Sequence, residues 1–167
     1  MVGIAGGPEK CAEVVELYGF DVCLDYRESH LAERLHTECP RGIDLYFDNV
    51  GGEILEAALH NIAMHGRVVL CGAIAQYNAT DMGPGIRNTF MLIMRRARMQ
   101  GFIVLDYFDR MSEAQMALAG LLLSGKLHHR EHLVQGLEHA PDALNLLFNG
   151  GNHGKTLVVV DDSVTLA

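Results

Sequence analysis

The sequence predicts an α/β protein of the Rossmann type, with a doubly wound parallel sheet and helices on both of its faces. Short apolar or β-branched runs alternate along the chain with helix-length amphipathic segments, which is the pattern of successive βαβ units. Several runs stop at glycines, where a strand can turn into a helix. With 167 residues, of which 49% are hydrophobic, the chain is long enough for one ordinary core.

The first two strands are each followed by a short helix. A strand at Val2–Ala5 stops at a glycine pair, after which Pro8 opens a helix over residues 8–18. A second strand over residues 22–26 leads into a helix over residues 29–37.

The middle of the chain carries the strongest strand signal. Residues 43–50 form an apolar and aromatic run, and a helix with one apolar face follows over residues 53–64. Gly66 is expected to end this helix, and the continuous apolar run over residues 67–73 predicts a strand buried on both faces. Residues 76–85 are rich in turn-forming side chains and predict an irregular loop.

The remaining elements continue the alternation. They are a helix over residues 88–98, a strand over 101–105, helices over Met111–Leu123 and 138–148, and a last strand over 156–160. No repeat or linker divides the chain, so we predict one domain over residues 1–160 and a frayed tail over 161–167.

Charge and cysteine content exclude several classes of protein. A net charge of −8 would repel a phosphate backbone, so we expect no nucleic-acid partner. No run approaches the roughly 18 consecutive apolar residues of a membrane span, so we expect no membrane segment. The four cysteines lie far apart without a Cys-x-x-Cys pair, which favours a reducing, cytoplasmic location.

Turns after the predicted strands carry the candidate ligand-binding residues. Ligands of open parallel sheets bind at the carboxyl ends of the strands. Those ends read Ala-Gly-Gly after the first strand, Asp-Tyr-Arg after the second, Asp-Asn-Val-Gly-Gly after the third and Cys-Gly-Ala-Ile after the fourth. A tight turn is explanation enough for any one glycine, but the series of such turns points to a shared ligand.

These turns and their order resemble a known family. The segments GIAGGPEKC, DYR, IDLYFDNVGG, GRVVLCGAI, GFIVLDY and NHGKT resemble the NADPH-dependent alkenal and prostaglandin reductases. These are zinc-independent members of the medium-chain dehydrogenase/reductase superfamily, and the resemblance runs from about residue 1 to residue 160. It implies NADP as the cofactor and a small enone or enal as the substrate.

The resemblance also implies an incomplete sheet. Family members begin with a barrel-like domain, then the first nucleotide-binding strand and its glycine-rich loop, whereas this sequence has no Gly-x-Gly-x-x-Gly motif. In the strand order 3-2-1-4-5-6 the first strand is central. Without it we expect the sheet to split and the chain to be inactive alone, as a truncated product would be.

The end of the first strand bears on the choice between NAD and NADP. A site for NAD places a carboxylate there, which would repel a 2′-phosphate, but this sequence has Gly6 and Gly7 followed by Lys10. The resemblance implies that Lys10 and Tyr26 contact that phosphate, with Arg27 as a helper. A solvated Lys10 on an exposed helix face is the alternative.

Further cofactor contacts are implied by the same resemblance. They are Gly6, Asn49, Cys71, Gly72, Ala73, Ile74, Tyr77, Phe102, Ile103, Val104, Asn152 and Gly154. The asparagines at positions 49 and 152 are equally suited to forming turns, Asn49 through an Asx turn before a glycine pair.

Tyr77 is the candidate for a catalytic role. Its phenol follows the fourth strand and could hydrogen-bond a developing enolate oxygen or relay a proton to it. Ala75 stands where many family members have serine, and simple packing is the alternative role for Tyr77. His128, His129 and His132 lack a partner set at ligand spacing, so we expect no metal site there.

The sequence thus predicts the cofactor domain of an NADPH-dependent reductase that transfers hydride to the C=C bond of enones or enals. A non-catalytic dimerisation remnant and a quinone oxidoreductase of the same superfamily are the alternatives. In related enzymes the strand matching residues 101–105 pairs across a two-fold axis, which implies a homodimer.

Overall fold

The computed structural model describes residues 1–77 and 85–160 and confirms the α/β class. Within these residues all strand pairs are parallel. The chain divides into two compact units, Met1–Met116 and Ala117–Ala167, which are described separately. Most of the predicted loop at 76–85 and the predicted tail at 161–167 lie outside the described residues.

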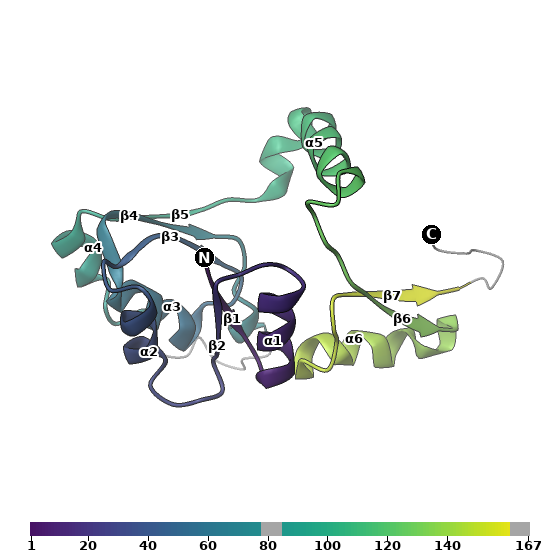
Figure 1. Cartoon of the computed structure of the whole chain (residues 1–167), viewed down its shortest axis with the longest axis horizontal. Coiled ribbons are helices and arrows are strands. Elements are labelled where there is room, and N and C mark those ends of the chain that lie inside the picture. The colour runs from purple at the N-terminus through teal and green to yellow at the C-terminus, as the bar shows by residue number, and fades with distance from the viewer. Residues whose placement is uncertain (78–84, 161–167) are drawn as a thin grey trace. The chain divides into compact units, whose positions relative to one another are not determined.

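The first sheet of the N-terminal unit pairs β1 (Val2–Ala5) with β2 (Val22–Asp25) (Figure 1). The helix α1 (Pro8–Glu16) connects these strands along the chain and has proline in its first turn, as the sequence predicts. Gly7 precedes this helix with φ 97°, a left-handed region that favours glycine.

The second sheet has the order β3-β4-β5, with β3 (Ile43–Asp48), β4 (Ile62–Leu70) and β5 (Arg98–Gly101). Two helices, α3 (Gly52–His60) and α4 (Phe90–Arg95), accompany it. A cluster of buried apolar side chains forms its core: Leu55, Leu59, Ile62 and Val68.

Contacts between α3 and α2 (Leu31–Glu38) join the two sheets. Leu24, Leu35 and Ala57 form a second buried cluster there. The buried Asn61 side chain donates to the Ala32 carbonyl oxygen at 2.8 Å and to the Ala57 carbonyl oxygen at 3.0 Å. The helices hold the sheets together while the strands themselves remain split, as the sequence predicts.

The second unit contains β6 (Glu131–Gln135), α6 (Ala140–Asn149) and β7 (Lys155–Val159). The strands β6 and β7 pair in parallel, with a 3-10 turn at Leu137–His139 before α6. The helix α5 (Met111–Leu123) matches its prediction and spans the division between the units.

The predicted strand at residues 101–105 is wrong. The strand β5 ends at Gly101, and Val104–Arg110 is a 3-10 helix. The Phe102 amide donates to the carbonyl oxygen of Leu70, the last residue of β4, so the chain beyond has no partner strand to continue the ladder. The apolar run therefore stays exposed at Ile103, Val104 and Leu105.

The boundary between α3 and β4 is also misplaced in the prediction. The helix ends at His60, and the strand begins at Ile62 instead of after Gly66. The Asn61 amide satisfies a carbonyl of the last helical turn, which ends the helix. Gly66 lies inside the strand, where a Cβ atom would come within 2.8 Å of the Ile43 carbonyl oxygen.

The expectation that β4 is buried on both faces needs correction as well. Val68 is buried, but its neighbour Arg67 is exposed and Val69 and Leu70 are half-buried.

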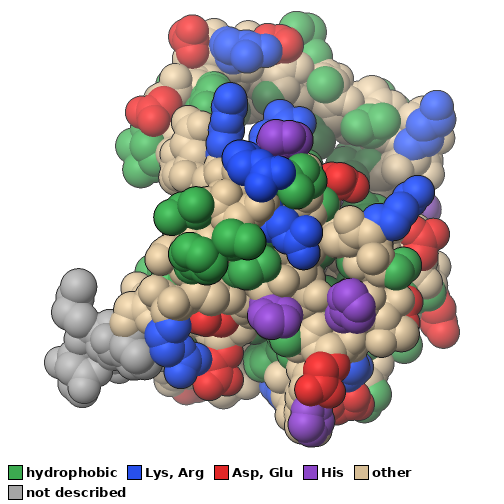
Figure 2. All heavy atoms as spheres, turned by 90° about the vertical axis from the view of Figure 1, so that its left-hand side faces the viewer, with side chains coloured by type: hydrophobic (Ala, Val, Ile, Leu, Met, Phe, Trp, Pro, Cys, Tyr) green, Lys and Arg blue, Asp and Glu red, His purple; other side chains and the backbone are tan. Residues whose placement is uncertain are grey.

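Acidic, basic and apolar side chains are interspersed over the face of the molecule shown in Figure 2. Among the described residues, no helix is long and apolar enough to cross a membrane.

Candidate functional site

The turn after β1 lies directly against the residue that follows β2. The Tyr26 amide donates to the Ala5 carbonyl oxygen at 3.0 Å, extending the ladder by one bond. A Cβ atom on Gly6 would lie 2.9 Å from the Tyr26 hydroxyl oxygen. The structure therefore brings two predicted cofactor-binding residues, Gly6 and Tyr26, into contact, and any larger residue at position 6 would displace the phenol.

A buried carboxylate holds this turn in place. Asp25, the last residue of β2, is 8% exposed, and its Oδ1 accepts hydrogen bonds from the Gly7 and Arg27 amides at 2.9 Å each. These two bonds, the Gly7 bond first, lower the pKa of Asp25, and the Arg27 and Arg34 charges lower it further. The sequence interpretation missed this role, although an aspartate that ends a strand before a turn is a typical Asx-turn signal.

Positive charge gathers around the same turn. Lys10 lies in the first turns of α1, whose amino end carries the positive pole of the helix dipole. The Arg27 guanidinium lies beside the turn, since a Cβ atom on Gly7 would be 3.4 Å from its Nη1 atom. The first strand ends without a carboxylate, as the sequence shows, but the Asp25 carboxylate from the end of β2 lies beside the turn. It accepts hydrogen bonds from two backbone amides there.

A second buried carboxylate organises the turn after β3. Asp48 is 1% exposed, and its oxygens accept hydrogen bonds from the amides of Val50 and Gly51 at 3.0–3.1 Å. The Tyr46 hydroxyl donates to Asp48 Oδ1 at 3.0 Å. Burial first, and then the Asp48 charge, raises the pKa of Tyr46, so the phenol keeps its proton.

Asn49 does not make the Asx turn that the sequence suggested for it. The Gly51 amide, two residues ahead of Asn49, donates instead to the carboxylate of Asp48. The Asn49 carbonyl oxygen accepts from the Ile74 amide at 3.2 Å, and Asn49 itself is exposed. Its backbone is therefore fixed while the residue stays open to solvent.

The segment after β4 is anchored to the turn after β3. The amides of Cys71 and Gly72 donate to the Asp48 carbonyl oxygen at 2.8 and 3.2 Å. A Cβ atom on Gly72 would lie 3.1 Å from the Asn49 carbonyl oxygen, so Gly72 permits a close approach of the two segments. Gly72 and Ile74 thus lie beside Asn49, and Cys71 lies beside Asp48, while their contact with a cofactor stays a prediction.

Tyr77 lies over this segment. Its hydroxyl oxygen accepts a long hydrogen bond of 3.5 Å from the Ala73 amide, and a Cβ atom on Gly72 would be 3.4 Å from that oxygen. Tyr77 is 65% exposed, which argues against the alternative that its role is packing.

Phe102 follows β5 and joins an aromatic row. Its ring centroid lies 6.2 Å from that of Phe47 in β3 and 6.1 Å from that of Tyr107. Ile103 and Val104 continue from it with exposed side chains. Of these three predicted residues, Phe102 contacts β3, through the ring of Phe47.

Asn152 and Gly154 belong to the second unit and form a local turn. The Asn152 side-chain amide donates to the Gly154 carbonyl oxygen at 2.9 Å. Gly154 has φ 80°, and a Cβ atom there would overlap the Arg130 carbonyl oxygen at 2.1 Å. The turn-forming role considered for Asn152 is therefore present, and its contact with a cofactor stays a prediction.

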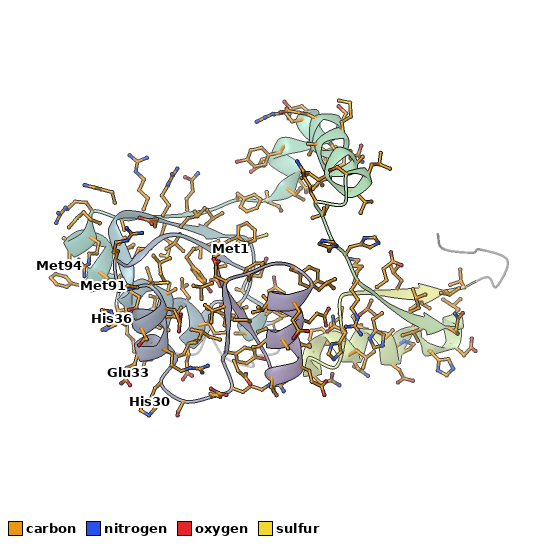
Figure 3. All side chains as sticks on the ribbon, in the orientation of Figure 1. Met1, His30, Glu33, His36, Met91 and Met94 are labelled. Carbon is orange, nitrogen blue, oxygen red and sulfur yellow. The ribbon has the colours of Figure 1, made fainter. Side chains whose placement is uncertain are left out.

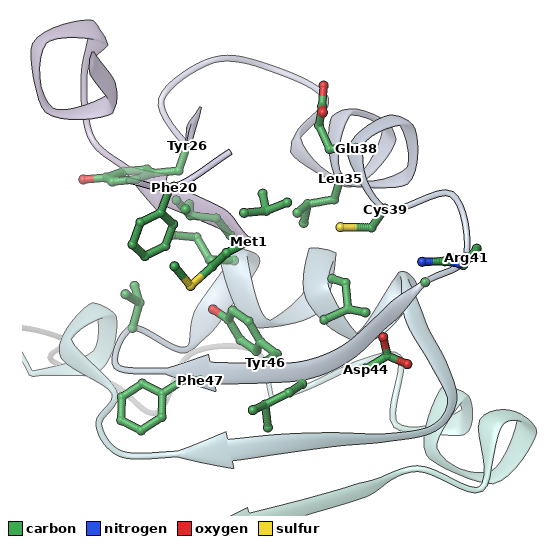
Figure 4. Close-up of a pocket in the computed structure, with 18 of the residues that line it drawn as sticks. Met1, Phe20, Tyr26, Leu35, Glu38, Cys39, Arg41, Asp44, Tyr46 and Phe47 are labelled. Carbon is green, nitrogen blue, oxygen red and sulfur yellow. The ribbon is translucent and has the colours of Figure 1, made fainter. Parts of the chain in front are cut away.

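A large cavity lies between β1 and β3 and reaches the residues that follow β2 and β3 (Figure 4). It has a volume of about 990 Å³ and is lined by Tyr26, Asn49 and Val50, among others. A smaller cavity of about 390 Å³ is lined by Tyr26 and Ser29 together with Val50 and Gly51. The residues that follow β2 and β3 thus border common space.

Residues of metal-ligating type do not converge in the described parts of the chain. His30, Glu33 and His36 follow one another along α2 (Figure 3), with His30 Nδ1 3.3 Å from Glu33 Oε2. Over residues 1–77 and 85–160, no group of three or more histidine, cysteine, aspartate or glutamate side chains is arranged to hold a metal ion.

Comparison with known proteins identifies related sequences for nearly all of this chain. A family profile described as zinc-binding dehydrogenase matches residues 1–119. The NADPH-dependent curcumin reductase of Escherichia coli is 41% identical over 165 residues, which cover 96% of this chain and 48% of that protein. The NADP-dependent 2-alkenal reductase of Nicotiana tabacum is 41% identical over 161 residues, 96% of this chain and 47% of that protein.

A solved structure shares the fold as well as the sequence. The crystal structure of CurA from Vibrio vulnificus in complex with NADPH has a TM-score of 0.89 and 43% identity, covering 96% of this chain and 49% of CurA. The chain spans about half the length of the curated relatives it matches.

Proposed function

The chain belongs to the zinc-binding dehydrogenase family, and from this premise we propose that it is the cofactor-binding portion of an NADPH-dependent reductase of carbon–carbon double bonds. Family membership confirms the resemblance to medium-chain dehydrogenases/reductases. The observation that carries the proposal is the turn after β1, where Gly6 touches Tyr26 and two basic residues, Lys10 and Arg27, stand nearby.

The residues of this turn fit the 2′-phosphate of NADP. Gly6 leaves the Tyr26 hydroxyl accessible, and Arg27 beside Gly7 adds a guanidinium suited to a phosphate. The carboxylate of Asp25 accepts two backbone amides, which offset its repulsion of an anion. The relatives agree with this choice, because the E. coli protein is named NADPH-dependent and CurA was solved with NADPH.

The residues that follow β3 and β4 fit the ribose and nicotinamide half of the cofactor. Asn49 offers an amide that can donate and accept, and residues 71–74 offer backbone groups beside it. Gly72 has no side chain, so a flat ring can approach the backbone there. Phe102 would add an aromatic wall, and Ile103 and Val104 an exposed apolar one.

The chemistry that NADPH supplies when bound is hydride transfer to the β-carbon of an α,β-unsaturated ketone or aldehyde. In our proposal the exposed Tyr77 hydroxyl donates a hydrogen bond to the substrate carbonyl oxygen or relays the proton that the α-carbon takes up. The names of the relatives support this substrate class, since one is a 2-alkenal reductase and another a (+)-pulegone reductase.

Two further features belong to the proposal. We infer a homodimer, because β5 is the outer strand of the sheet β3-β4-β5 and the exposed Val104 and Leu105 follow it. We also infer a cytoplasmic location, for which the four free cysteines are the support. Light scattering of the purified chain measures the first; a monomer at all concentrations would contradict it.

The test of the cofactor assignment is the substitution Lys10→Ala, with Lys126→Ala as a matched control in the second unit. Titrations of each variant with NADPH and NADH, followed by cofactor fluorescence, should show a loss of about tenfold in affinity for NADPH only. Lys126→Ala should change neither affinity. Equal losses for both cofactors in Lys10→Ala would contradict the role of Lys10 at the 2′-phosphate.

A further inference from the structure

The turn after β2, residues 25–28, carries two of the side chains that the proposed function places at the 2′-phosphate. They are Tyr26, which lies against Gly6, and Arg27, which lies beside Gly7. Both side chains are exposed, so packing around them fixes their position only in part. Where they lie therefore depends on how firmly the backbone of the turn is held.

Two hydrogen bonds within the turn shape its backbone. The Arg27 amide donates to Asp25 Oδ1 at 2.9 Å, and the Glu28 amide donates to the Asp25 carbonyl oxygen at 3.3 Å. The second bond is long for an amide and a carbonyl, so it holds the end of the turn weakly. The turn needs a further support if its side chains are to keep one arrangement.

That support comes from Arg34 of α2. Its Nη1 atom donates to the Asp25 carbonyl oxygen at 2.9 Å and lies 2.9 Å from Glu28 Oε2. A single nitrogen thus joins the first and the last residue of the turn. The Arg34 side chain is only 30% exposed, and solvent screens an ion pair less when one partner is withdrawn from water.

The helix α2 gives Arg34 a firm base. Leu35, the next residue in the chain, is 2% exposed and packs with Leu24 and Ala57 in a buried cluster. The Arg34 amide donates to the His30 carbonyl oxygen at 3.1 Å, so its backbone is part of the helix. Because a packed cluster resists displacement, Arg34 ties the exposed turn to the core.

We propose that Arg34 is a positioning residue for NADP, which holds the turn at residues 25–28 so that Tyr26 and Arg27 meet the 2′-phosphate together. This inference rests on the proposed function, which places the phosphate at these side chains. Glu28 balances the charge of Arg34, so Arg34 contributes geometry to the site and little net attraction for an anion. Arg34 thereby sets the preference for NADPH over NADH without touching the phosphate.

The test measures the binding of 2′,5′-ADP and of 5′-AMP to the full chain by NMR titration. Arg34→Ala should weaken the binding of 2′,5′-ADP about fivefold and leave that of 5′-AMP unchanged within about twofold, because only the first probe has a 2′-phosphate. The matched control is Arg110→Ala, which removes an arginine paired with a glutamate at 3.0 Å away from the turn. It should change neither affinity.

Arg34→Lys tests whether one nitrogen is enough. Since Nη1 alone makes both contacts, a lysine ammonium can take its place, although it lacks the planar fork of a guanidinium. The affinity for 2′,5′-ADP should return to within about twofold of the wild-type value. A loss as large as that in Arg34→Ala would overturn the proposed contact.

Glu28→Ala gives a test that depends on the direction of the effect. Removing a carboxylate near a phosphate site would by itself strengthen anion binding. If Glu28 acts through Arg34, the turn loosens instead, and 2′,5′-ADP should bind about threefold more weakly. Glu28 is 62% exposed, so this variant should fold and decides the question even if Arg34→Ala does not fold. Unchanged or tighter binding would overturn the proposal.

Failure of this inference and failure of the proposed function are distinguishable. If the wild type binds both probes equally, the assignment of the 2′-phosphate fails, and the role of Arg34 fails with it. If the wild type prefers 2′,5′-ADP but Arg34→Ala weakens both probes alike or neither, the assignment stands and only the role of Arg34 is overturned. Equal weakening is the result expected of a residue that merely stabilises the fold.

Discussion

The turns after β2 and β3 use the same device in different electrostatic surroundings. Each strand ends in a buried aspartate that accepts two backbone amides. Asp48 accepts both from the turn beyond it, whereas Asp25 accepts one from Arg27 beyond it and one from Gly7 in the turn after β1. Around Asp25 stand Arg27 and Arg34, whereas the side-chain partner of Asp48 is the neutral phenol of Tyr46. Both carboxylates thus shape a turn, one among basic side chains and the other beside a neutral phenol.

The surroundings of the two turns suit different ligand chemistry. We call the adjoining turns after β1 and β2 the first turn, and the turn after β3 the second turn. Basic residues beside the first turn suit a phosphate, and the backbone and amide groups beside the second suit a neutral ring or ribose. We therefore expect substitutions in the turn after β3 to act mainly on folding, and those in the turns after β1 and β2 to act mainly on anion binding or on stability in acid.

The largest expected effect is on the stability of the second turn. Asp48→Ala leaves the Val50 and Gly51 amides and the Tyr46 hydroxyl without their acceptor in a buried place, so the free energy of unfolding should fall by about 3 kcal/mol. Urea unfolding measures it, with the exposed Asp109→Ala as the control. A loss as small as that of Asp109→Ala would remove Asp48 as the organiser of this turn.

The next effect separates binding from folding at the first turn. Gly6→Ala places a methyl group 2.9 Å from the Tyr26 hydroxyl, and Tyr26 is exposed enough to move aside. Binding of 2′,5′-ADP should weaken about tenfold while the unfolding midpoint changes little. Gly120→Ala, at a position with open space around it, is the control. Unchanged binding in Gly6→Ala would mean that the position of Tyr26 does not matter to the phosphate.

A smaller effect appears in the pH dependence of stability. Because hydrogen bonds lower the pKa of Asp25 below its ordinary 3.8, its ionised form stabilises the fold above that pH, and this stabilisation is lost as the pH falls through the lowered pKa. Asp25→Asn should therefore be less stable than the wild type near neutral pH, and the difference should shrink in acid. Denaturation at several pH values tests this, with Asp109→Asn as the control; a difference that grows in acid has the wrong sign.

The smallest effect is expected at Tyr77. Its hydroxyl makes one long bond of 3.5 Å from an exposed ring, so Tyr77→Phe should alter the free energy of unfolding by less than about 0.5 kcal/mol. A loss well above that value would restore packing as the role of this residue. The contrast with Asp48→Ala is the sharpest measure of which groups hold the second turn.

Local signals in the sequence were sufficient for elements whose ends depend on nearby residues. The strand Val2–Ala5 stops at glycine, and the helix Met111–Leu123 ends before Ser124 and Gly125, so both match their predictions. The strand Glu131–Gln135 was missed, because its EHLVQ sequence has few apolar residues and it is a strand through its pairing with β7.

The candidate site was predictable in composition but not in its supports. Glycines after strands mark where a ligand can approach, and Gly6 and Gly72 do make close approaches. Asp48 accepts amides only two and three residues ahead, a local pattern that the sequence contains, whereas Asp25 also accepts the Gly7 amide, 18 residues away along the chain. Sequence spacing does not record such distant partners.

Two small probes on the unmodified chain test directly whether the turn after β1 recognises the 2′-phosphate of NADP. The dissociation constants of 2′,5′-ADP and 5′-AMP, measured by NMR titration, isolate the contribution of the 2′-phosphate to binding at the first turn. We expect 2′,5′-ADP to bind at least about tenfold more tightly and to shift the amide signals of Gly6, Gly7 and Lys10. Equal affinities, or tighter binding of 5′-AMP, would contradict it.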